Sequence, residues 1–410
     1  MPSDEQVNLA VASLQPEVWT SSSNEALSIF ITDTKGSAQS FKPTFTYPIF
    51  GDAESIFGYK DLSILLCFDA VTFRPFLNVK WGAKLDQTEV DPKTKMLEFL
   101  PESTVFKDEL KWREEIDAES QSYEIPGKIV GEPFSRDGEQ YAIYRLDLAS
   151  ERGIELQKRL QILVLLFIEA GSFIDYSDPL WDVYVMYKVS DPKFPEVVGF
   201  TTAYNYWKYP GHASFDEGKV ETRKKISQFI VLPIHQGKKL GGEMYSHLYK
   251  SWMQDGNVVE IVVEDPSESF DDLRDRVDFT RLVETKKLDL SSLTVAQASD
   301  PKWFNELKTK EKLEKRQLQR LLEMAFFYQL SHNIASDTKK TVRLFVKRRL
   351  YEKNKEALAT LDGPTRLDKL QTAYEALEAD YHRILEPITI NVKRAAPADE
   401  GVASKRSKIQ

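Results

Sequence analysis

The chain has 410 residues, which is long enough for two or three domains and a large hydrophobic core. Its 41% hydrophobic and 11% aromatic residues exclude a largely disordered protein, while its net charge of −9 argues against a general nucleic-acid binder and mildly favours a cationic ligand. The single cysteine, Cys67, excludes an intramolecular disulfide and fits a reducing compartment, and its apolar neighbours indicate a buried thiol.

The N-terminal third of the chain predicts a small α+β domain. Residues 1–25 are polar, lack the pattern of a signal peptide and are expected to be flexible. Ala26–Thr32 is predicted to be a strand, and the apolar runs Leu62–Ala70 and Phe73–Trp81 are predicted to form a hairpin. The acidic segment that follows gives no clear prediction. We therefore assign residues 26–148 to one α+β domain.

The centre of the chain predicts strands around a helix. Residues 149–172 have the pattern of an amphipathic to apolar helix that carries Glu169. Its unbroken apolar part, Ile162–Ile168, is too short to span a bilayer, so we expect a soluble protein without membrane association. Trp181–Val189 and Val197–Asn205 are predicted to be strands. This succession indicates a mixed α/β sheet.

The most informative stretch predicts a strand, a turn, a helix and a second strand. Ile226–Leu232 is β-branched and apolar, and a glycine-bearing turn leads from it into a segment with apolar residues at helical spacing. Val258–Val263 is the second strand, and Glu264 and Asp265 follow it directly. A helix that begins after a glycine turn offers unpaired N–H groups to an anion, which favours a phosphate, although an ordinary turn has the same pattern. We assign residues 149–285 to this domain.

The C-terminal part of the chain differs in composition. Leucines and aromatic residues recur at helical spacing within residues 300–388, which predicts a small helical domain whose basic faces are either solvated or bind nucleic acid. Residues 389–410 are predicted to be a disordered tail. Two basic clusters within residues 393–408 have the spacing of a bipartite nuclear localisation signal, which predicts binding to a nuclear import receptor and a location in nucleus and cytoplasm. The alternative is a basic tail without that role.

Several motifs carry a resemblance to a known family. The stretch from Gln236 to Gly241 resembles the acetyl-CoA signature of the GNAT acetyltransferase superfamily but departs from it at Lys239, where a glycine is expected. The segments SQFIVLP, VEDPSESFDDLRDR, FIEAGSFID and FGYKDLSILL resemble the catalytic subunit of type B histone acetyltransferases, from about Phe50 to Arg276. The resemblance implies a GNAT-type core with a mixed α/β sheet, an N-terminal α+β domain and a C-terminal helical domain.

This resemblance implies direct transfer of acetyl from acetyl-CoA to tail lysines of newly made histone H4, without a metal. A lysine must lose its proton before it attacks a thioester, so a carboxylate within reach is required. The resemblance gives this general-base role to Glu264 and a secondary role to Glu169 in the cleft. Asp265 is a further catalytic candidate, although the order Asp265-Pro266 also suits a helix N-cap closed by Glu268 in a capping box.

The resemblance also assigns cosubstrate contacts. Residues of the first strand would pair with the pantetheine arm through their backbone, and the turn with the start of the helix would wrap the pyrophosphate. The residues at the corresponding positions are Phe229, Ile230, Val231, Gln236, Gly237, Lys238, Lys239, Leu240, Gly241, Gly242, Ser267 and Arg276.

Substrate and partner contacts follow from the same resemblance. The positions that match histone-tail contacts are Asp52, Ala53, Glu54, Tyr204, Asn205 and Tyr206. Residues 206–217 are predicted to form an aromatic loop that either anchors a WD-repeat β-propeller histone chaperone subunit or folds back on the core. Two alternatives to a histone acetyltransferase are open: a histone-binding scaffold without catalysis, which the Lys239 departure favours, and a GNAT enzyme for a small amine.

Overall fold

The computed structural model describes residues 16–86, 88 and 90–390, and the nuclear localisation signal expected at 393–408 lies outside them. The chain forms two compact units, of which unit 1 ends at Asp265 and unit 2 begins at Pro266. Within the described residues, no helix is long and apolar enough to cross a membrane.

The first part of unit 1 consists of a five-stranded sheet, two short two-stranded sheets and several short helices. The strands of the five-stranded sheet run in the order β3-β2-β6-β7-β9, in which β6 and β7 form the predicted antiparallel hairpin and β2 pairs with β6 in parallel. The elements of this region are α2 (Pro16–Trp19), β1 (Thr20–Ser22), α3 (Ser23–Ala26), β2 (Leu27–Thr32), β3 (Ala38–Phe41), α4 (Tyr47–Phe50), β4 (Ser55–Phe57), β5 (Tyr59–Lys60), β6 (Ser63–Asp69), β7 (Pro75–Lys80), β8 (Ala83–Lys84), α5 (Pro92–Leu97), β9 (Val105–Phe106) and α6 (Glu109–Ser120).

The second sheet of unit 1 has seven strands. Six run in the order β10-β12-β13-β14-β15-β16, and β11 also pairs with β12. Neighbours are antiparallel except β15 and β16, which are parallel because helix α10 connects them. The elements are β10 (Gly127–Ile129), β11 (Phe134–Arg136), β12 (Glu139–Leu146), α7 (Glu151–Leu160), α8 (Ile162–Phe167), β13 (Trp181–Lys188), β14 (Glu196–Lys208), α9 (His212–Asp216), β15 (Glu221–Val231), η1 (Pro233–His235), α10 (Leu240–Gln254) and β16 (Val258–Val263).

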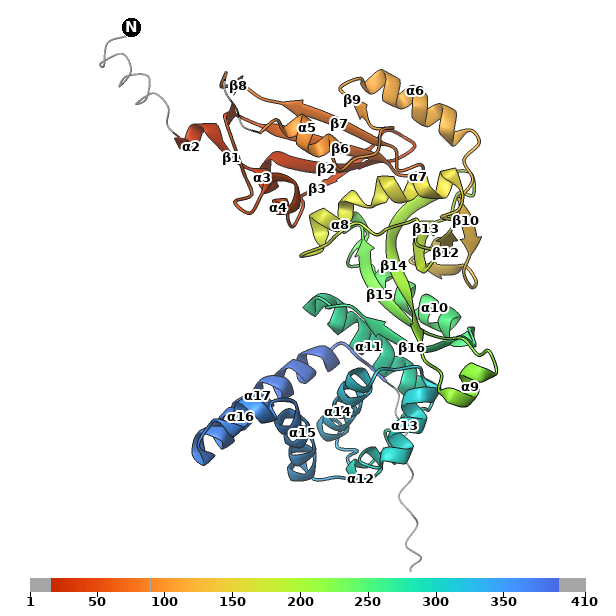
Figure 1. Ribbon diagram of the computed structural model, residues 1–410, viewed down its shortest axis with the longest axis vertical. Coiled ribbons are helices and arrows are strands. Elements are labelled where there is room, and N and C mark those ends of the chain that lie inside the picture. The colour runs from red at the N-terminus through yellow and green to blue at the C-terminus, as the bar shows by residue number, and fades with distance from the viewer. Residues whose placement is uncertain (1–15, 87, 89, 391–410) are drawn as a thin grey trace, which may run out of the picture. The chain divides into compact units, whose positions relative to one another are not determined.

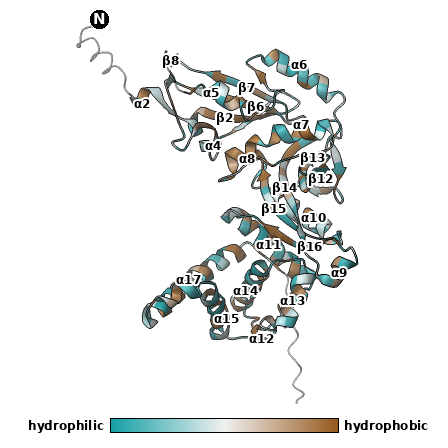
Figure 2. Ribbon diagram, viewed as in Figure 1, coloured by the Kyte–Doolittle hydropathy of each residue, from teal (hydrophilic) through white to brown (hydrophobic). Residues whose placement is uncertain are grey.

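The two sheets share one hydrophobic core, with α7 and α8 between them (Figure 1). All six residues of α8 are apolar, as its colour shows in Figure 2, and five of them are buried. They belong to the same buried cluster as Ile64 and Leu66 of the first sheet and Val183 and Val185 of the second. The domain boundary that we expected between residues 148 and 149 is therefore wrong, because an apolar helix buried on several sides joins both sheets into one folding unit.

The N-terminal segment also differs from the expectation of flexibility up to residue 25. Strand β1 pairs with β4 through Thr20–Ser22. The buried Ser23 hydroxyl forms a hydrogen bond of 2.6 Å with the Thr46 hydroxyl. These contacts fix the described residues before Ala26, because a paired strand and a buried hydroxyl bond require an ordered backbone.

Unit 2 is helical, as predicted, but begins at residue 266 rather than near 300. It contains α11 (Glu268–Glu284), α12 (Val295–Ala298), α13 (Pro301–Lys310), α14 (Lys315–Ser331), α15 (Lys339–Lys353), α16 (Lys355–Ala359) and α17 (Gly363–Leu385). The central helix α14 contacts α11, α15 and α17. It is buried on most sides, and its buried polar groups are paired: Arg349 of α15 binds Glu323, and Gln317 donates to Asp275 at 3.0 Å.

Candidate active site

The parallel strands β15 and β16 separate beside Glu264, the predicted general base. Their pairing ends at Ile226 and Val263, and the Glu264 amide then donates to the Ile226 carbonyl at 2.9 Å. Strand β15 continues to Val231, so its segment 227–231 is an edge that β16 does not cover within the described residues. An edge of this kind can pair with an extended ligand through its backbone.

A β-bulge in β15 directs extra polar groups into this region. Ala203 of β14 pairs with Ile226 while Thr202 pairs with Gln228, which leaves Ser227 as the extra residue. Because a bulge shifts the alternation of side chains, both Ser227 and Gln228 line the same cleft. The Gln228 amide donates to the Ser172 carbonyl at 2.7 Å, which ties the strand to the segment after α8.

Glu264 lies in this cleft as an ionised hydrogen-bond acceptor. Its Oε2 accepts from the Ser227 hydroxyl at 2.6 Å, and its Oε1 forms an ion pair with the Lys225 ammonium. Partial burial raises the pKa of Glu264, but the bonds from Lys225 and Ser227 and the charge of Lys225 lower the pKa by more, so that it lies below its usual value. The side chain is 44% exposed, so a substrate amine can reach it.

Lys225 is held by the same contacts. Its burial lowers the pKa, but the hydrogen bonds with Glu264 and Tyr206 raise it by more, so the side chain is cationic at neutral pH. Its Nζ also lies 4.8 Å from the centroid of the Tyr206 ring, a distance typical of a cation–π contact.

The cleft has a volume of about 590 Å³ and contains three carboxylates, from Glu169, Glu264 and Asp265. Glu169 faces the cleft but is not in a helix, contrary to our prediction of a helix over 149–172. Helix α8 ends at Phe167, because Ile168 is extended, with φ −115° and ψ 120°, and Ala170 then has a positive φ of 54°. Glu169 is therefore an exposed turn residue, and no cost of burying its charge arises.

Aromatic rings form one wall of the cleft. Tyr204 contacts Trp181 and Tyr206 in edge-to-face geometry, with centroid distances of 4.9 and 4.7 Å. The Tyr204 hydroxyl donates to Asp178 at 3.0 Å, which fixes its ring. Of the predicted tail contacts on β14, Tyr204 and Tyr206 thus lie together in the cleft.

Asn205 lies on the opposite face of the same strand, away from the cleft, and its contact with the tail stays a prediction. Successive side chains of a strand alternate between faces, and the Asn205 amide donates to Asp182 and to the Leu180 carbonyl, each at 2.9 Å. Asp182 is 2% exposed and also binds Lys224 at 2.7 Å. Trp252 of α10 packs on this face, with Lys224 Nζ 5.5 Å from its ring.

The turn between η1 and α10 has the features of an anion site. Gly237 has a φ of +76°, and a Cβ there would meet no atom within 4 Å, so the space beside it is open. Lys239 precedes α10 with a left-handed backbone, φ 61° and ψ 12°, and its own side chain does not cap this helix. The first amides of α10, from Leu240 to Gly242, are therefore available to a pyrophosphate. These residues fit the phosphate part of acetyl-CoA.

The departure of Lys239 from the signature now has a structural meaning. A glycine is favoured where φ is positive, and Lys239 adopts that conformation without being glycine. Gln236 folds its side-chain amide back onto the Val231 carbonyl at 2.9 Å, which fixes the end of β15 relative to the turn. The turn therefore keeps its shape despite the substitution.

Ser267 and Arg276, the remaining predicted cosubstrate contacts, belong to unit 2. Ser267 is the N-cap of α11, since its hydroxyl accepts from the Phe270 amide at 3.3 Å. The N-cap that we considered at Asp265 is thus wrong, because the helix begins at Glu268. Arg276 donates to Asp272 at 3.1 Å and to the Ile384 carbonyl at 3.2 Å. Asp265 itself lines the cleft with an unusual φ of 34°.

The predicted tail contacts at residues 52–54 lie in another turn of unit 1. Asp52 and Ala53 are exposed, but the Glu54 carboxylate accepts from the Thr46 and Tyr47 amides at 2.6 and 3.1 Å. The Thr46 amide is the main cause that holds the pKa of Glu54 below its usual value. Glu54 therefore stabilises the start of α4 rather than presenting its charge to a ligand.

Residues 206–217, predicted as a loop, contain the end of β14 and all of α9. Three of their aromatic side chains, from Trp207, Tyr209 and Phe215, are more than half exposed and contact one another, with centroid distances of 5.8 to 6.4 Å. We call these three residues the aromatic cluster. It is not folded back on the core.

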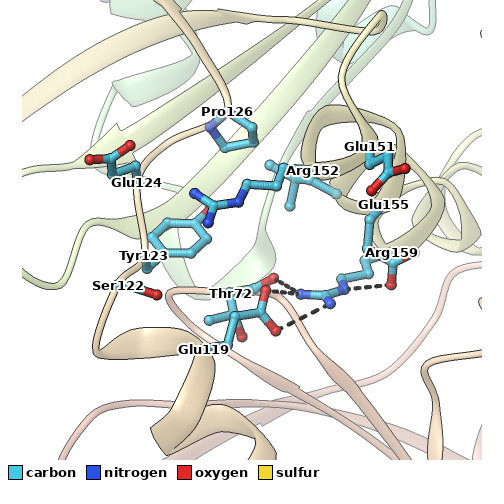
Figure 3. Close-up of a pocket in the computed structure, with 11 residues that line it drawn as sticks. Thr72, Glu119, Ser122, Tyr123, Glu124, Pro126, Glu151, Arg152, Glu155 and Arg159 are labelled. Atoms are coloured by element: carbon cyan, nitrogen blue, oxygen red, sulfur yellow. Dashed lines mark hydrogen bonds and ion pairs between the residues drawn. The ribbon is translucent and has the colours of Figure 1, made fainter.

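A second cavity, of about 360 Å³, lies between α7 and the segment after α6 (Figure 3). Arg159, which is buried, donates there to Glu119, Glu155 and the Thr72 carbonyl (Figure 3). These contacts stabilise the packing of α7 on the first sheet. This cavity shares no lining residue with the cleft beside Glu264.

Sequence reasoning missed Lys225, Ser227, Gln228 and Trp181 as cleft residues. A signal was present for two of them, because Ser227 and Gln228 are the polar residues within the predicted apolar strand 226–232. Within residues 16–86, 88 and 90–390, no group of three or more His, Cys, Asp or Glu residues could hold a metal ion.

Two families match parts of the chain. Residues 19–169 match the family described as histone acetyl transferase HAT1 N-terminus, and residues 275–331 match the one described as fungal HAT1, C-terminal. Proteins named histone acetyltransferase type B catalytic subunit are similar over nearly the whole chain. The protein of Debaryomyces hansenii is 60% identical over 98% of this chain and 97% of its own length, and that of Candida albicans is 54% identical over 100% of both. That of Kluyveromyces lactis is 44% identical over 96% and 99%.

A solved aminoglycoside acetyltransferase from a soil metagenomic sample aligns with 34% of this chain and 85% of its own, at 18% identity and a TM-score of 0.24. The mixed sheet, the glycine-bearing turn before α10 and the separated strands β15 and β16 form a mixed α/β core. The chain belongs to the family of histone acetyltransferase type B catalytic subunits. It is therefore an acyltransferase.

Proposed function

We propose that the protein transfers acetyl from acetyl-CoA to lysines in the N-terminal tail of newly synthesised histone H4, with Glu264 as the general base. The observation that carries this proposal is the position of Glu264 in a cleft with two further carboxylates and an aromatic wall. Such a cleft attracts a cationic side chain and holds it by cation–π and ionic contacts. A histone-tail lysine has such a cationic side chain.

The cosubstrate would lie along the uncovered edge of β15. Backbone groups of residues 227–231 would pair with the pantetheine arm, and the turn from Gln236 to Gly242 would hold the pyrophosphate. An extended segment of five residues spans roughly 16 Å. An arm that leaves the turn and follows this edge therefore ends where β15 and β16 separate, beside Glu264.

Each residue of the cleft then has a separate role in acetyl transfer. The ionised Glu264 takes the proton of the incoming ammonium, directly or through a water, and the Ser227 hydroxyl keeps the carboxylate oriented. Tyr204 and Tyr206 position the aliphatic part of the lysine. The neutral amine attacks the thioester directly, with no covalent enzyme intermediate; Glu169 and Asp265 are secondary acceptors for the proton.

Two partner proposals accompany this function. The aromatic cluster supports binding of a WD-repeat β-propeller histone chaperone subunit, because exposed aromatic side chains that contact one another are typical interface anchors. Residues 393–408 would bind a nuclear import receptor and bring the protein from cytoplasm to nucleus. Deleting 393–410 should then reduce nuclear accumulation and leave transfer in vitro unchanged; undiminished accumulation would contradict the import role.

The proposed function is tested by acetyl transfer to an H4 tail peptide with wild-type protein and Glu264→Gln. Glutamine keeps the shape of the side chain and can still bond Ser227, but it cannot take a proton. We expect kcat to fall by about 10² to 10⁴ fold, the range that general-base catalysis supplies, with acetyl-CoA affinity nearly unchanged.

The matched control is Asp265→Asn, the neighbouring carboxylate in the cleft, because asparagine accepts the positive φ of this position. Its effect on kcat should be far smaller. An equal loss in both variants would assign the base to the pair rather than to Glu264. Peptide binding without any transfer would instead favour the histone-binding scaffold.

A further inference from the structure

Lys225 lies where an acceptor lysine would have to lie. Its Nζ contacts Glu264 Oε1 and sits 4.8 Å from the Tyr206 ring centroid. Its side chain is only 16% exposed and lines the cleft. A substrate ammonium would need the same base and the same aromatic wall, so the chain's own lysine occupies that position first.

The adjacent Lys224 shows that this placement is specific. Lys224 points to the opposite face of the sheet, is 5% exposed and pairs with the buried Asp182 at 2.7 Å. Strand alternation therefore puts one of two neighbouring lysines at the base and hides the other beneath α10. The two residues differ in surroundings but not in type, which makes Lys224 an internal control.

The uncovered edge of β15 also leads to Lys225. Residues 227–231 begin two positions after it, at the place where β16 leaves β15. If the pantetheine arm follows this edge, its thioester comes to the start of the edge, next to the Lys225–Glu264 pair. The amine, its base and the acyl donor would then meet without any movement of the backbone.

We propose that Lys225 is a self-acetylation site of this protein, an inference that rests on the proposed function. The Lys225 ammonium gives a proton to Glu264, and the neutral nitrogen attacks the carbonyl carbon of acetyl-CoA. The N–C bond forms and the C–S bond breaks; the nitrogen then gives its second proton to the departing thiolate, so that coenzyme A leaves as the thiol and an amide stays on Lys225. The remaining proton passes from Glu264 to solvent.

Acetylation changes the cleft in favour of the peptide substrate. The acetylated side chain is neutral and cannot form the ion pair, so Glu264 becomes available to an incoming lysine. The Lys225–Glu264 pair is only partly buried, since Glu264 is 44% exposed, and such a pair is worth about 1 kcal/mol at most. We therefore expect the KM for an H4 tail peptide to fall by up to about fivefold, with a smaller change in kcat.

The test incubates the full-length protein with acetyl-CoA and no peptide and locates acetyl groups by peptide mass spectrometry. Acetyl on Lys225, none on Lys224 and a first-order rate that does not change on dilution are expected. The Glu264→Gln protein should acetylate Lys225 at least about 100-fold more slowly, whereas purely chemical acetylation would continue at the same rate and overturn the proposal. A rate that rises with protein concentration would overturn transfer within one chain.

Peptide kinetics separate this inference from the proposed function. Glu264-dependent acetylation of the H4 peptide with an unmodified Lys225 would overturn self-acetylation alone; failure of both reactions would overturn both. Lys225→Gln, which imitates the acetylated residue, should show the lowered peptide KM, and Lys225→Arg, which keeps the charge, should not. The same KM in both variants would contradict the argument that loss of the Lys225 charge frees Glu264 from its ion pair.

Discussion

Lys239 allows the strain of one backbone position to be measured. It stands where the signature has glycine, and its φ of 61° lies in the left-handed region directly before α10. We consider two substitutions that both remove the ammonium. Lys239→Gly removes the Cβ as well, whereas Lys239→Ala keeps it, so the difference between the two variants reports the backbone conformation alone.

The magnitude follows from two opposing effects. A left-handed conformation costs a residue with a Cβ roughly 1 to 2 kcal/mol, which glycine does not pay. Glycine also gives the unfolded chain more freedom, which costs about 0.4 to 1 kcal/mol. With the middle of each range, the Lys239→Gly protein should therefore be more stable than Lys239→Ala by about 0.8 kcal/mol.

Acetyl-CoA affinity should behave differently. Lys239 is exposed, so its contact with a phosphate is worth about 0.2 to 1 kcal/mol, and both variants should bind up to about fivefold more weakly than wild type. If a Cβ at this position also hinders the phosphate, the glycine variant binds more tightly than the alanine variant.

Urea denaturation and calorimetric titration with acetyl-CoA measure both quantities, and Lys238→Ala in the same turn serves as the control for charge loss. An alanine variant as stable as the glycine variant, or more stable, would refute the argument from backbone strain. Unchanged affinity in both variants would show that Lys239 does not contact the cosubstrate.

Three further predictions concern other parts of unit 1. Lys224→Met should lower the free energy of unfolding, measured in urea, by about 3 kcal/mol, because the buried charge of Asp182 loses its ion pair with Lys224. Adding Asp182→Asn to the same chain should restore part of this stability. A double variant no more stable than Lys224→Met would contradict the pairing. Burial, with smaller effects of Lys238 and Lys188, lowers the pKa of His235 from 6.5 to about 4, so stability present above pH 6.5 should be lost as pH falls toward 4. The urea midpoint should lose this slope in His235→Asn, and an unchanged slope would assign it elsewhere. Trp207→Ala should change stability by less than about 0.5 kcal/mol but weaken chaperone-subunit binding at least tenfold in a pull-down titration, and equal binding would remove the aromatic cluster as an anchor.

Local patterns in the sequence determined the central unit of this fold. The predicted strand at 258–263 agrees with β16, and the hairpin of β6 and β7 is confirmed, because apolar alternation over a few residues specifies a strand wherever it is buried. Glu264 could be chosen because it directly follows a strand. Its resemblance to the family's base position rests on the same local motif.

Contacts between distant residues were decided only by the tertiary structure. Sequence spacing cannot show that α8 joins two sheets in one core, that the extended Ile168 ends the helix before Glu169, or that Ser227 is a bulge residue. The face occupied by Asn205 depends on strand register, since a shift of one residue moves every side chain to the other side. The same register places Lys225 against Glu264 and sends Lys224 to Asp182, because each strand pairs through contacts that are remote in sequence.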